Sequence, residues 1–228
     1  MASGWWDADG TISGCVAAYS PVGAANLAAS YTNLQNPGTY DAAPGVAPTF
    51  NTATGWAFNG TTQYLDTGYT PPQVMSMVVR FSDATASGES IVIGARTGAL
   101  GPWIEHWGPG NMQFRRNSSG QINILGAPAT ATGTAGISYT DAYINGASVG
   151  TFSTLFGISG VSVWIGAGQN SGVLYRPWPG KVQAAAIYAA SLTAGEMATL
   201  HTRMLALPVA ASAKGLPIIT HYHRQVWG

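Results

Sequence analysis

Residues 55–68, GWAFNGTTQYLDTG, place an Asn-Gly dipeptide between two short runs of aromatic and aliphatic residues. Asn-Gly is the strongest short-range signal of a two-residue hairpin turn, because both positions tolerate the positive φ that such a turn requires. The stretch therefore predicts two short strands joined at Asn59 and Gly60. Residues 141–149 carry a second Asn-Gly dipeptide between apolar residues and predict a second hairpin.

In the rest of the chain, turn-forming residues separate short apolar segments, which is typical of an all-β protein. Gly, Pro, Asn and Ser interrupt short apolar or alternating runs roughly every 8–12 residues, which is typical of a β sandwich or barrel. Further predicted strands are residues 74–81, 90–94, 103–107, 112–116, 161–166 and 181–188.

One helix is predicted near the C-terminus. Thr193 and Glu196 have the spacing of a capping box, in which each side chain satisfies a backbone N–H at the start of a helix. Apolar residues then recur at helical spacing, and Pro208 ends the helix. These apolar residues, which we expect to pack in the core, are Met197, Leu200, Met204 and Leu207. Residues 24–34 are a candidate for one further short helix.

The chain is poor in charge. Only 8% of its 228 residues are charged, and nine Lys and Arg balance nine Asp and Glu, so the basic field that binds nucleic acid is absent. The uncharged runs contain many Gly, Ser, Thr, Asn and Pro, so they are not membrane spans. Hydrophobic residues at 46% exclude disorder. A surface with little like-charge repulsion favours a protein that sits in an assembly, although a monomer with a neutral polar surface has the same composition.

The N-terminus and the cysteine usage bear on the cellular context. The first residues have neither a basic segment nor an apolar segment, so no secretory signal is expected. Cys15 is the single cysteine, which excludes an intrachain disulfide. Because it lies in the apolar stretch CVAAY, we expect a buried structural thiol and no nucleophile.

Three segments resemble concanavalin A-like, laminin-G-like jelly-roll domains. Residues 55–68 resemble the aromatic opening strand, turn and Tyr-Leu strand of that family, residues 142–146 its recurring Tyr-hydrophobic-Asn-Gly hairpin, and residues 180–197 its closing strand and short helix. The three segments occur in family order. The Ala-, Gly- and Thr-rich style, with an N-terminal arm, also resembles laminin-G-like proteins of tailed bacteriophages.

The resemblance implies an all-β, concanavalin A-like jelly-roll sandwich with one short C-terminal helix and extended terminal arms. Residues 1–48 are expected to form an N-terminal arm with the first strand or strands, residues 49–207 the laminin-G-like jelly roll, and residues 208–228 a C-terminal arm. The tail ends in a β-like run that needs a partner strand, in its own sheet or in another chain. The assembly contacts predicted there are Ile218, Ile219, Tyr222 and Trp227.

Aromatic residues on and beside the central strands are candidates for a sugar site. A flat aromatic face stacks on a sugar ring while polar side chains bind its hydroxyls. The predicted carbohydrate-binding residues are Trp103, Glu105, Trp107, Arg115, Asn117, Tyr175 and Trp178. The alternative is that most of these aromatic side chains, with Trp164, fill the sandwich core or a subunit interface.

Catalytic carboxylates are not apparent in the pattern. Retaining glycosidases hold two carboxyl groups about 5–5.5 Å apart, which favours acids two or four residues apart on one strand. Asp7 and Asp9 are the pair with that spacing, and they lie outside the predicted jelly roll, whereas Glu89 and Glu105 lie on separate runs. We therefore expect no catalytic residue and a protein that is not an enzyme.

Metal sites are weakly indicated. Asp7-Ala8-Asp9-Gly10 lacks the further ligands of a calcium loop and predicts a turn. A single structural calcium is considered near Asp66 or Asp141, and a zinc site that begins with His221 and His223 is the other metal site considered, although no third ligand lies near them in the sequence. His221 and His223 are expected to lie on the polar face of the terminal strand, and no other cofactor is expected.

These observations support three functions. The main prediction is a structural protein of a bacteriophage particle, a capsid decoration or appendage subunit whose partners are its own copies and other virion proteins. The alternative is a carbohydrate-binding module, in a virion or extracellular, which recognises glycans through exposed Trp and Tyr. A glycoside hydrolase is the third. Nucleic acid and membranes are not expected partners.

Overall fold

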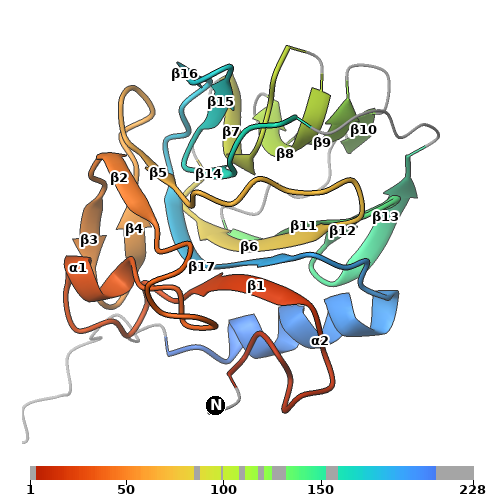
Figure 1. Ribbon diagram of the computed structural model, residues 1–228, viewed down its shortest axis with the longest axis horizontal. Helices are drawn as coiled ribbons and strands as arrows, with labels where there is room; N and C mark the ends of the chain where they lie inside the picture. Colours follow the sequence, from red (N-terminus) through yellow and green to blue (C-terminus); the bar gives the residue numbers. More distant parts are fainter. Residues whose placement is uncertain are drawn as a thin grey trace, which may run out of the picture.

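The computed structural model describes residues 4–84, 88–98, 100–107, 111–117, 121–124, 132–152 and 159–208, with side chains for all but 117 and 121–124. Two β-sheets pack face to face, a small hairpin lies outside one of them, and a helix lies outside the other (Figure 1). The predicted jelly-roll sandwich with a short C-terminal helix is confirmed.

The first sheet has the strand order β13-β12-β11-β6-β17-β4-β3, and β1 pairs with β17 beside this path. Its members are β1 (Cys15–Tyr19), β3 (Thr49–Asn51), β4 (Gly55–Ala57), β6 (Ser76–Ser82), β11 (Thr132–Ser138), β12 (Asp141–Ile144), β13 (Ala147–Thr151) and β17 (Lys181–Tyr188).

The second sheet has the order β10-β9-β8-β7-β14-β5-β2. Its members are β2 (Ala43–Val46), β5 (Tyr64–Asp66), β7 (Glu89–Gly94), β8 (Leu100–Trp107), β9 (Met112–Asn117), β10 (Gln121–Ile124) and β14 (Trp164–Ile165). Outside it, β15 (Gly168–Asn170) and β16 (Val173–Tyr175) form a hairpin, which lies above β14 and β7 in Figure 1.

Strand β6, which accounts for most of the predicted strand 74–81, is buried on both faces, whereas Val74 before it is exposed. Met77, Val79 and Phe81 point into the core between the sheets, while Val78 packs on the opposite side with the residues under the C-terminal helix. Each fully buried side chain of this size contributes about 1.5–3 kcal/mol. Ser76, Arg80 and Ser82 alternate with these core residues and are also buried, so the outer face of this strand is polar but covered by other parts of the protein.

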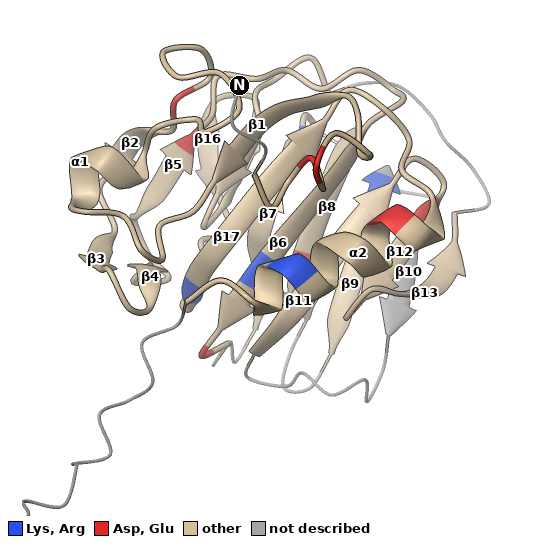
Figure 2. Ribbon diagram, turned by 90° about the horizontal axis from the view of Figure 1, so that it is seen from below, with Lys and Arg blue, Asp and Glu red and all other residues tan. Residues whose placement is uncertain are grey.

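The C-terminal helix α2 (Ala194–Leu205) covers the outer face of the first sheet (Figure 2). The predicted capping box is present: the Thr193 N–H donates to Glu196 Oε2 at 2.7 Å, and the Glu196 N–H donates to Thr193 Oγ1 at 3.3 Å. At the other end of α2, buried Arg80 donates to the carbonyl oxygen of Met204. A guanidinium at the C-terminus of a helix stabilises its unpaired carbonyls.

The segment 55–66 differs from the prediction. Strand β4 pairs with β3 and β17 in the first sheet, whereas β5 pairs with β2 and β14 in the second, so the chain crosses between the sheets and forms no hairpin here. The crossing loop folds on Asn59, whose Oδ1 accepts the backbone N–H groups of Thr61, Thr62 and Gln63 at 2.9–3.2 Å. Asn at a turn uses its own side chain as an acceptor in this way.

The second Asn-Gly dipeptide behaves as predicted. Strands β12 and β13 pair antiparallel through Asn145 (φ 50°) and Gly146 (φ 77°), which are the two positive-φ positions of a type I′ turn. The short helix predicted within 24–34 is reduced to α1 (Leu27–Ser30), whose N-cap is Asn26.

The termini are described in part. Residues 209–228 lie outside the described residues, and with them the predicted assembly contacts Ile218, Ile219, Tyr222 and Trp227. The boundaries after residues 48 and 207 stay predictions.

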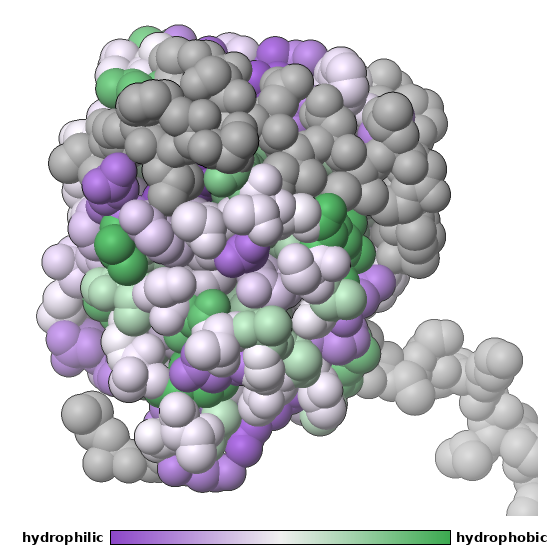
Figure 3. Space-filling view, turned by 90° about the vertical axis from the view of Figure 1, so that its right-hand side faces the viewer, coloured by the Kyte–Doolittle hydropathy of each residue, from purple (hydrophilic) through white to green (hydrophobic). Residues whose placement is uncertain are grey.

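Within the described part of the chain, no helix has the length and apolarity needed to cross a bilayer. The face in Figure 3 mixes small hydrophilic and hydrophobic patches.

Candidate functional site

The alternation of β8 separates core residues from a polar and aromatic face. Ile104 and His106 contact residues of the core between the sheets. Trp103, Glu105 and Trp107 occupy the alternate positions, so they share the outer face of the second sheet.

The neighbouring strand adds a cation to this face. On β9, Met112 and Phe114 belong to the core, so Gln113 and Arg115 point the other way. The antiparallel register places Arg115 opposite Trp103 and Gln113 opposite Glu105.

The β15–β16 hairpin brings two more residues from a distant part of the sequence. The backbone N–H of Ile91 on β7 donates to the carbonyl oxygen of Arg176 at 2.8 Å, which fastens the end of the hairpin to the sheet. Arg176 and the adjacent Tyr175 thus reach the same face as β8.

Glu105 is the centre of the charged contacts. Its side chain is 0% exposed, and its two oxygens accept hydrogen bonds from Arg115 Nε at 3.2 Å and Arg176 Nη1 at 2.8 Å. Burial raises the pKa of Glu105 above its ordinary value, and the charge of Arg115 acts in the opposite direction. The buried carboxylate holds two guanidinium groups side by side.

Glu89 continues this chain of contacts to the surface. Arg176 forms an ion pair with Glu89, and the Trp107 Nε1–H donates to Glu89 Oε1 at 2.7 Å. Trp107 is 37% exposed, so its ring meets solvent while its only polar atom is bound. The arrangement presents a fixed aromatic surface.

A third arginine stacks within the group. The Arg96 guanidinium carbon lies 4.1 Å from the ring centre of Tyr175 and 5.4 Å from that of Trp103, which is cation–π geometry. We call the whole group the aromatic–arginine cluster. Its members are Glu89, Arg96, Trp103, Glu105, Trp107, Arg115, Tyr175 and Arg176.

Most of the residues predicted for sugar binding come together here. The structure joins Trp103, Glu105, Trp107, Arg115 and Tyr175 in the cluster. Asn117 ends β9, and its side chain lies outside the described ones.

Trp178 was predicted wrongly. It is 0% exposed and packs in the sandwich core among Phe58, Phe81 and His106, with ring centres 6.3–6.5 Å away. A ring enclosed on all sides cannot stack on a sugar, and the same holds for Trp103, which lies in the cluster but is only 2% exposed beneath Arg96 and Arg115. The place of Trp178 agrees with the alternative considered for these aromatics, that they fill the core.

Three members of the cluster were not among the predicted residues. Glu89 and Arg96 lie on and just after β7, whereas Arg176 follows β16, and the β15–β16 hairpin that brings them together turns at Ser171-Gly172. Arg176 directly follows the predicted Tyr175, and this adjacency was the available signal.

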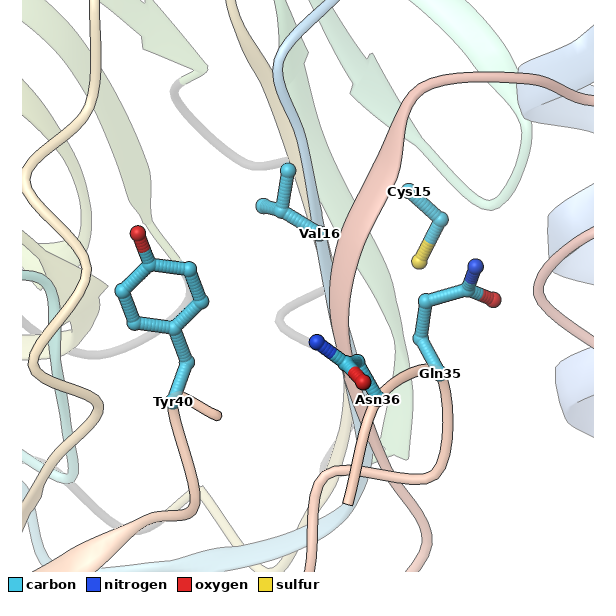
Figure 4. Close-up of a pocket in the computed structure, with 5 residues that line it drawn as sticks. All are labelled: Cys15, Val16, Gln35, Asn36 and Tyr40. Atoms are coloured by element: carbon cyan, nitrogen blue, oxygen red, sulfur yellow. The ribbon is translucent and has the colours of Figure 1, made fainter. Parts of the chain in front are cut away.

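A separate cavity of about 390 Å³ lies between β1 and the 35–40 loop, with Cys15, Val16, Gln35, Asn36 and Tyr40 around it (Figure 4). The Cys15 thiol donates to the Ala17 carbonyl at 3.6 Å, and burial raises its pKa to about 12. A thiol that stays protonated at neutral pH is a poor nucleophile, which agrees with the predicted structural role.

Among the described residues, no group of three His, Cys, Asp or Glu side chains gathers to hold a metal. The two positions considered for calcium are engaged locally. Asp66 Oδ1 accepts the Gly68 N–H at 2.8 Å, and Asp141 accepts the hydroxyls of Thr140 and Thr151 at 2.9 and 2.6 Å. His221 and His223 lie outside the described residues.

The two packed sheets define a lectin-like β sandwich. No protein-family model and no curated protein matches the chain. Among solved structures, it is similar to Trypanosoma rangeli sialidase in complex with sialic acid, with 13% identity and a TM-score of 0.63 over 85% of this chain and 33% of that one. It is also similar to NanB sialidase from Streptococcus pneumoniae, with 14% identity and a TM-score of 0.50 over 68% of this chain and 28% of that one. A third is the CBM40 of the Ruminococcus gnavus IT-sialidase bound to α2,3 sialyllactose, with 13% identity and a TM-score of 0.47 over 56% and 81%.

These comparisons correct one expectation. The chain was expected not to be an enzyme, yet two of the solved structures that share its fold are sialidase chains, so the fold is related to one that occurs in glycoside hydrolases. The likeness is one of fold, and the chain spans a third or less of the two sialidase chains. The predicted place in a phage particle finds no support in these comparisons and stays a prediction.

Proposed function

We propose that this chain binds glycans on the aromatic–arginine cluster, with the exposed ring of Trp107 as the platform for a sugar ring. The observation that carries the proposal is the tethered and exposed Trp107: Glu89 holds its N–H, so the free face of the ring is available for stacking. A side chain that is already fixed loses little conformational entropy when a ligand binds.

The charges of the cluster favour an acidic sugar. Three arginines stand against two glutamates, so the group carries a net charge of about +1 if all five are ionised. The chain has only 18 charged residues (9 + 9), and five of them gather here. Arginine matches the planar geometry of a carboxylate. The sialidase with the same fold was solved with sialic acid, an acidic sugar.

A glycan array probed with the full chain tests the proposal, followed by calorimetry on the sugars that bind. Trp107→Ala is expected to weaken binding at least about tenfold, equivalent to 1.4 kcal/mol, through the loss of the stacking surface. Trp107→Phe keeps a flat ring and should retain part of the affinity. Tyr40→Ala, which removes a similarly exposed ring elsewhere, is the matched control. Absence of binding to every glycan would overturn the proposal.

Glycoside hydrolysis is a second candidate, because Glu89 and Glu105 converge on one guanidinium, that of Arg176. Glu89 is the member of this pair that reaches solvent. Hydrolysis of chromogenic glycosides by the wild-type chain, abolished in Glu89→Gln, would support this second function. If the chain binds glycans but does not hydrolyse them, glycan binding is the sole function of the cluster and hydrolysis is excluded.

A further inference from the structure

A second cavity lies on the same face of the molecule as the aromatic–arginine cluster. It has a volume of about 510 Å³, within the range of small-molecule sites. The residues around it include Asp66, Thr70, Ser162, Trp164, Gln169 and Gly172.

The strand register shows that cavity and cluster share one face. Val163 and Ile165 belong to the core, so Trp164 between them points outward, like Trp103. Across the sheet, Trp164 pairs with Gly94, and Gly94 pairs with Trp103. Two strand spacings therefore separate the two tryptophans, about 10 Å along the sheet.

The β15–β16 hairpin contributes residues both to the second cavity and to the aromatic–arginine cluster. Gln169 on β15 lines the cavity, while its neighbour Asn170 forms a bridge with Arg96 of the cluster. Tyr175 and Arg176, at the other end of the hairpin, belong to the cluster. The cavity thus lies directly beside the cluster along the sheet, within the reach of a short oligosaccharide.

The chemistry of the cavity differs from that of the cluster. The described residues that line it include a carboxylate but no arginine or lysine. Asp66 uses Oδ1 for the Gly68 N–H, and its Oδ2 has no hydrogen-bond partner within the described part of the chain. Thr70 and Ser162 add hydroxyls, and Trp164 is held in place by stacking on Tyr64, with ring centres 3.9 Å apart. A carboxylate oxygen and hydroxyls suit the hydroxyl groups of a neutral sugar, and the negative charge of the carboxylate repels an acidic sugar.

We infer that this cavity is a second subsite, which binds a neutral sugar residue of an oligosaccharide whose acidic residue occupies the aromatic–arginine cluster. The inference rests on the proposed function, since it extends the same binding face. It assigns to Asp66 the recognition of sugar hydroxyls.

Calorimetry on the full chain with two probes tests the inference: sialic acid alone, and α2,3-sialyllactose, which adds two neutral sugars. Wild type should bind sialyllactose more tightly than sialic acid. Asp66→Asn keeps the acceptor for the Gly68 N–H, so the loop should fold, but it should weaken sialyllactose binding at least fivefold and leave sialic acid binding unchanged. Ser162→Ala should act in the same direction.

Two further variants separate this inference from the proposed function. Trp107→Ala should weaken both probes, and Asp83→Asn, which removes a carboxylate that pairs with Lys181, should weaken neither. Equal affinity of wild type for the two probes, or no effect of Asp66→Asn on sialyllactose, would overturn the second subsite alone. Failure of the wild-type chain to bind either probe would overturn the acidic-sugar proposal and the subsite together.

Discussion

Trp107 Nε1 donates a hydrogen bond to Glu89 Oε1 at 2.7 Å, which ties a ring that is 37% exposed to the neighbouring strand. The two residues are also register partners of β8 and β7. Glu89 in turn contacts Arg176, which contacts the buried Glu105. The position of the Trp107 ring at the surface therefore depends on a series of contacts that ends at the buried Glu105.

Removing Glu89 should release the ring. Glu89→Ala is expected to weaken glycan binding about three- to tenfold, since ordering a freed side chain costs about 0.5–1.5 kcal/mol. Calorimetry measures the affinity, and acrylamide quenching of tryptophan fluorescence reports the mobility of the ring. Glu89→Gln keeps an acceptor for the indole and serves as the control. Unchanged affinity in Glu89→Ala would show that the tether is irrelevant to binding.

Glu105 should matter for stability more than any exposed ion pair. Glu105→Gln leaves Arg115 and Arg176 without their shared counter-charge, and we expect a loss of about 2–3 kcal/mol in the free energy of unfolding. The value lies at the low end for a broken buried pair because both arginines reach solvent, which screens them. Urea unfolding measures it. Asp83→Asn, which breaks the exposed pair with Lys181, should cost less than about 1 kcal/mol, and similar losses in the two variants would contradict this account.

His106 should make the protein sensitive to mild acid. Burial lowers its pKa from 6.5 to about 4, so the unfolded chain takes up the proton first as the pH falls. Its contribution to stability is complete above the unfolded pKa and is lost between about pH 6.5 and 4, to a limit of about 3 kcal/mol.

His106→Phe tests this pH dependence, because Phe keeps an aromatic ring against Phe81 and Trp178. The difference in free energy of unfolding between wild type and variant, measured in urea from pH 7 to 4, should shift against the wild type as the pH falls. A difference that does not vary with pH would contradict the prediction.

The Asn145-Gly146 turn should be sensitive to a methyl group because it packs on α2. A Cβ at Gly146 would lie 3.0 Å from both Ala198 Cα and His201 Cβ, in addition to the strain of a φ of 77°. Gly10 has a similar φ, 82°, but a Cβ there meets nothing within 4 Å. We expect Gly10→Ala to cost about 1 kcal/mol in urea unfolding, and Gly146→Ala about 1–2 kcal/mol more. Equal losses in the free energy of unfolding for the two variants would contradict a close contact between this turn and α2.

Local signals predicted those elements whose stabilising contacts are themselves local. The capping box at Thr193 and Glu196 and the turn at Asn145 depend on neighbours within three residues, so the pattern sufficed. The same Asn-Gly signal at residue 59 predicted a hairpin, yet β4 and β5 separate into different sheets. Which strand pairs with which depends on long-range packing that a dipeptide does not encode.

The candidate site was predicted where it follows one strand. Trp103, Glu105 and Trp107 alternate on β8, and that spacing places them on one face in any sheet. Arg176 joins them across 71 residues through the β15–β16 hairpin, and the Ser171-Gly172 turn of that hairpin does not indicate which strand the hairpin packs against. Trp178 follows Tyr175 and Arg176 closely in the sequence, and nothing in that local sequence distinguishes it from the exposed aromatic candidates. Its burial follows only from the packing of both sheets.

The cover that α2 forms over the first sheet leaves the molecule with two unlike sides. Trp6 and Ile12 pack beneath the same helix, so the stretch before β1 and the chain at residue 208 both lie on that side, and the aromatic–arginine cluster lies on the other. A partner that binds the protein on its helical side would therefore leave the aromatic–arginine cluster exposed, because the two surfaces do not overlap.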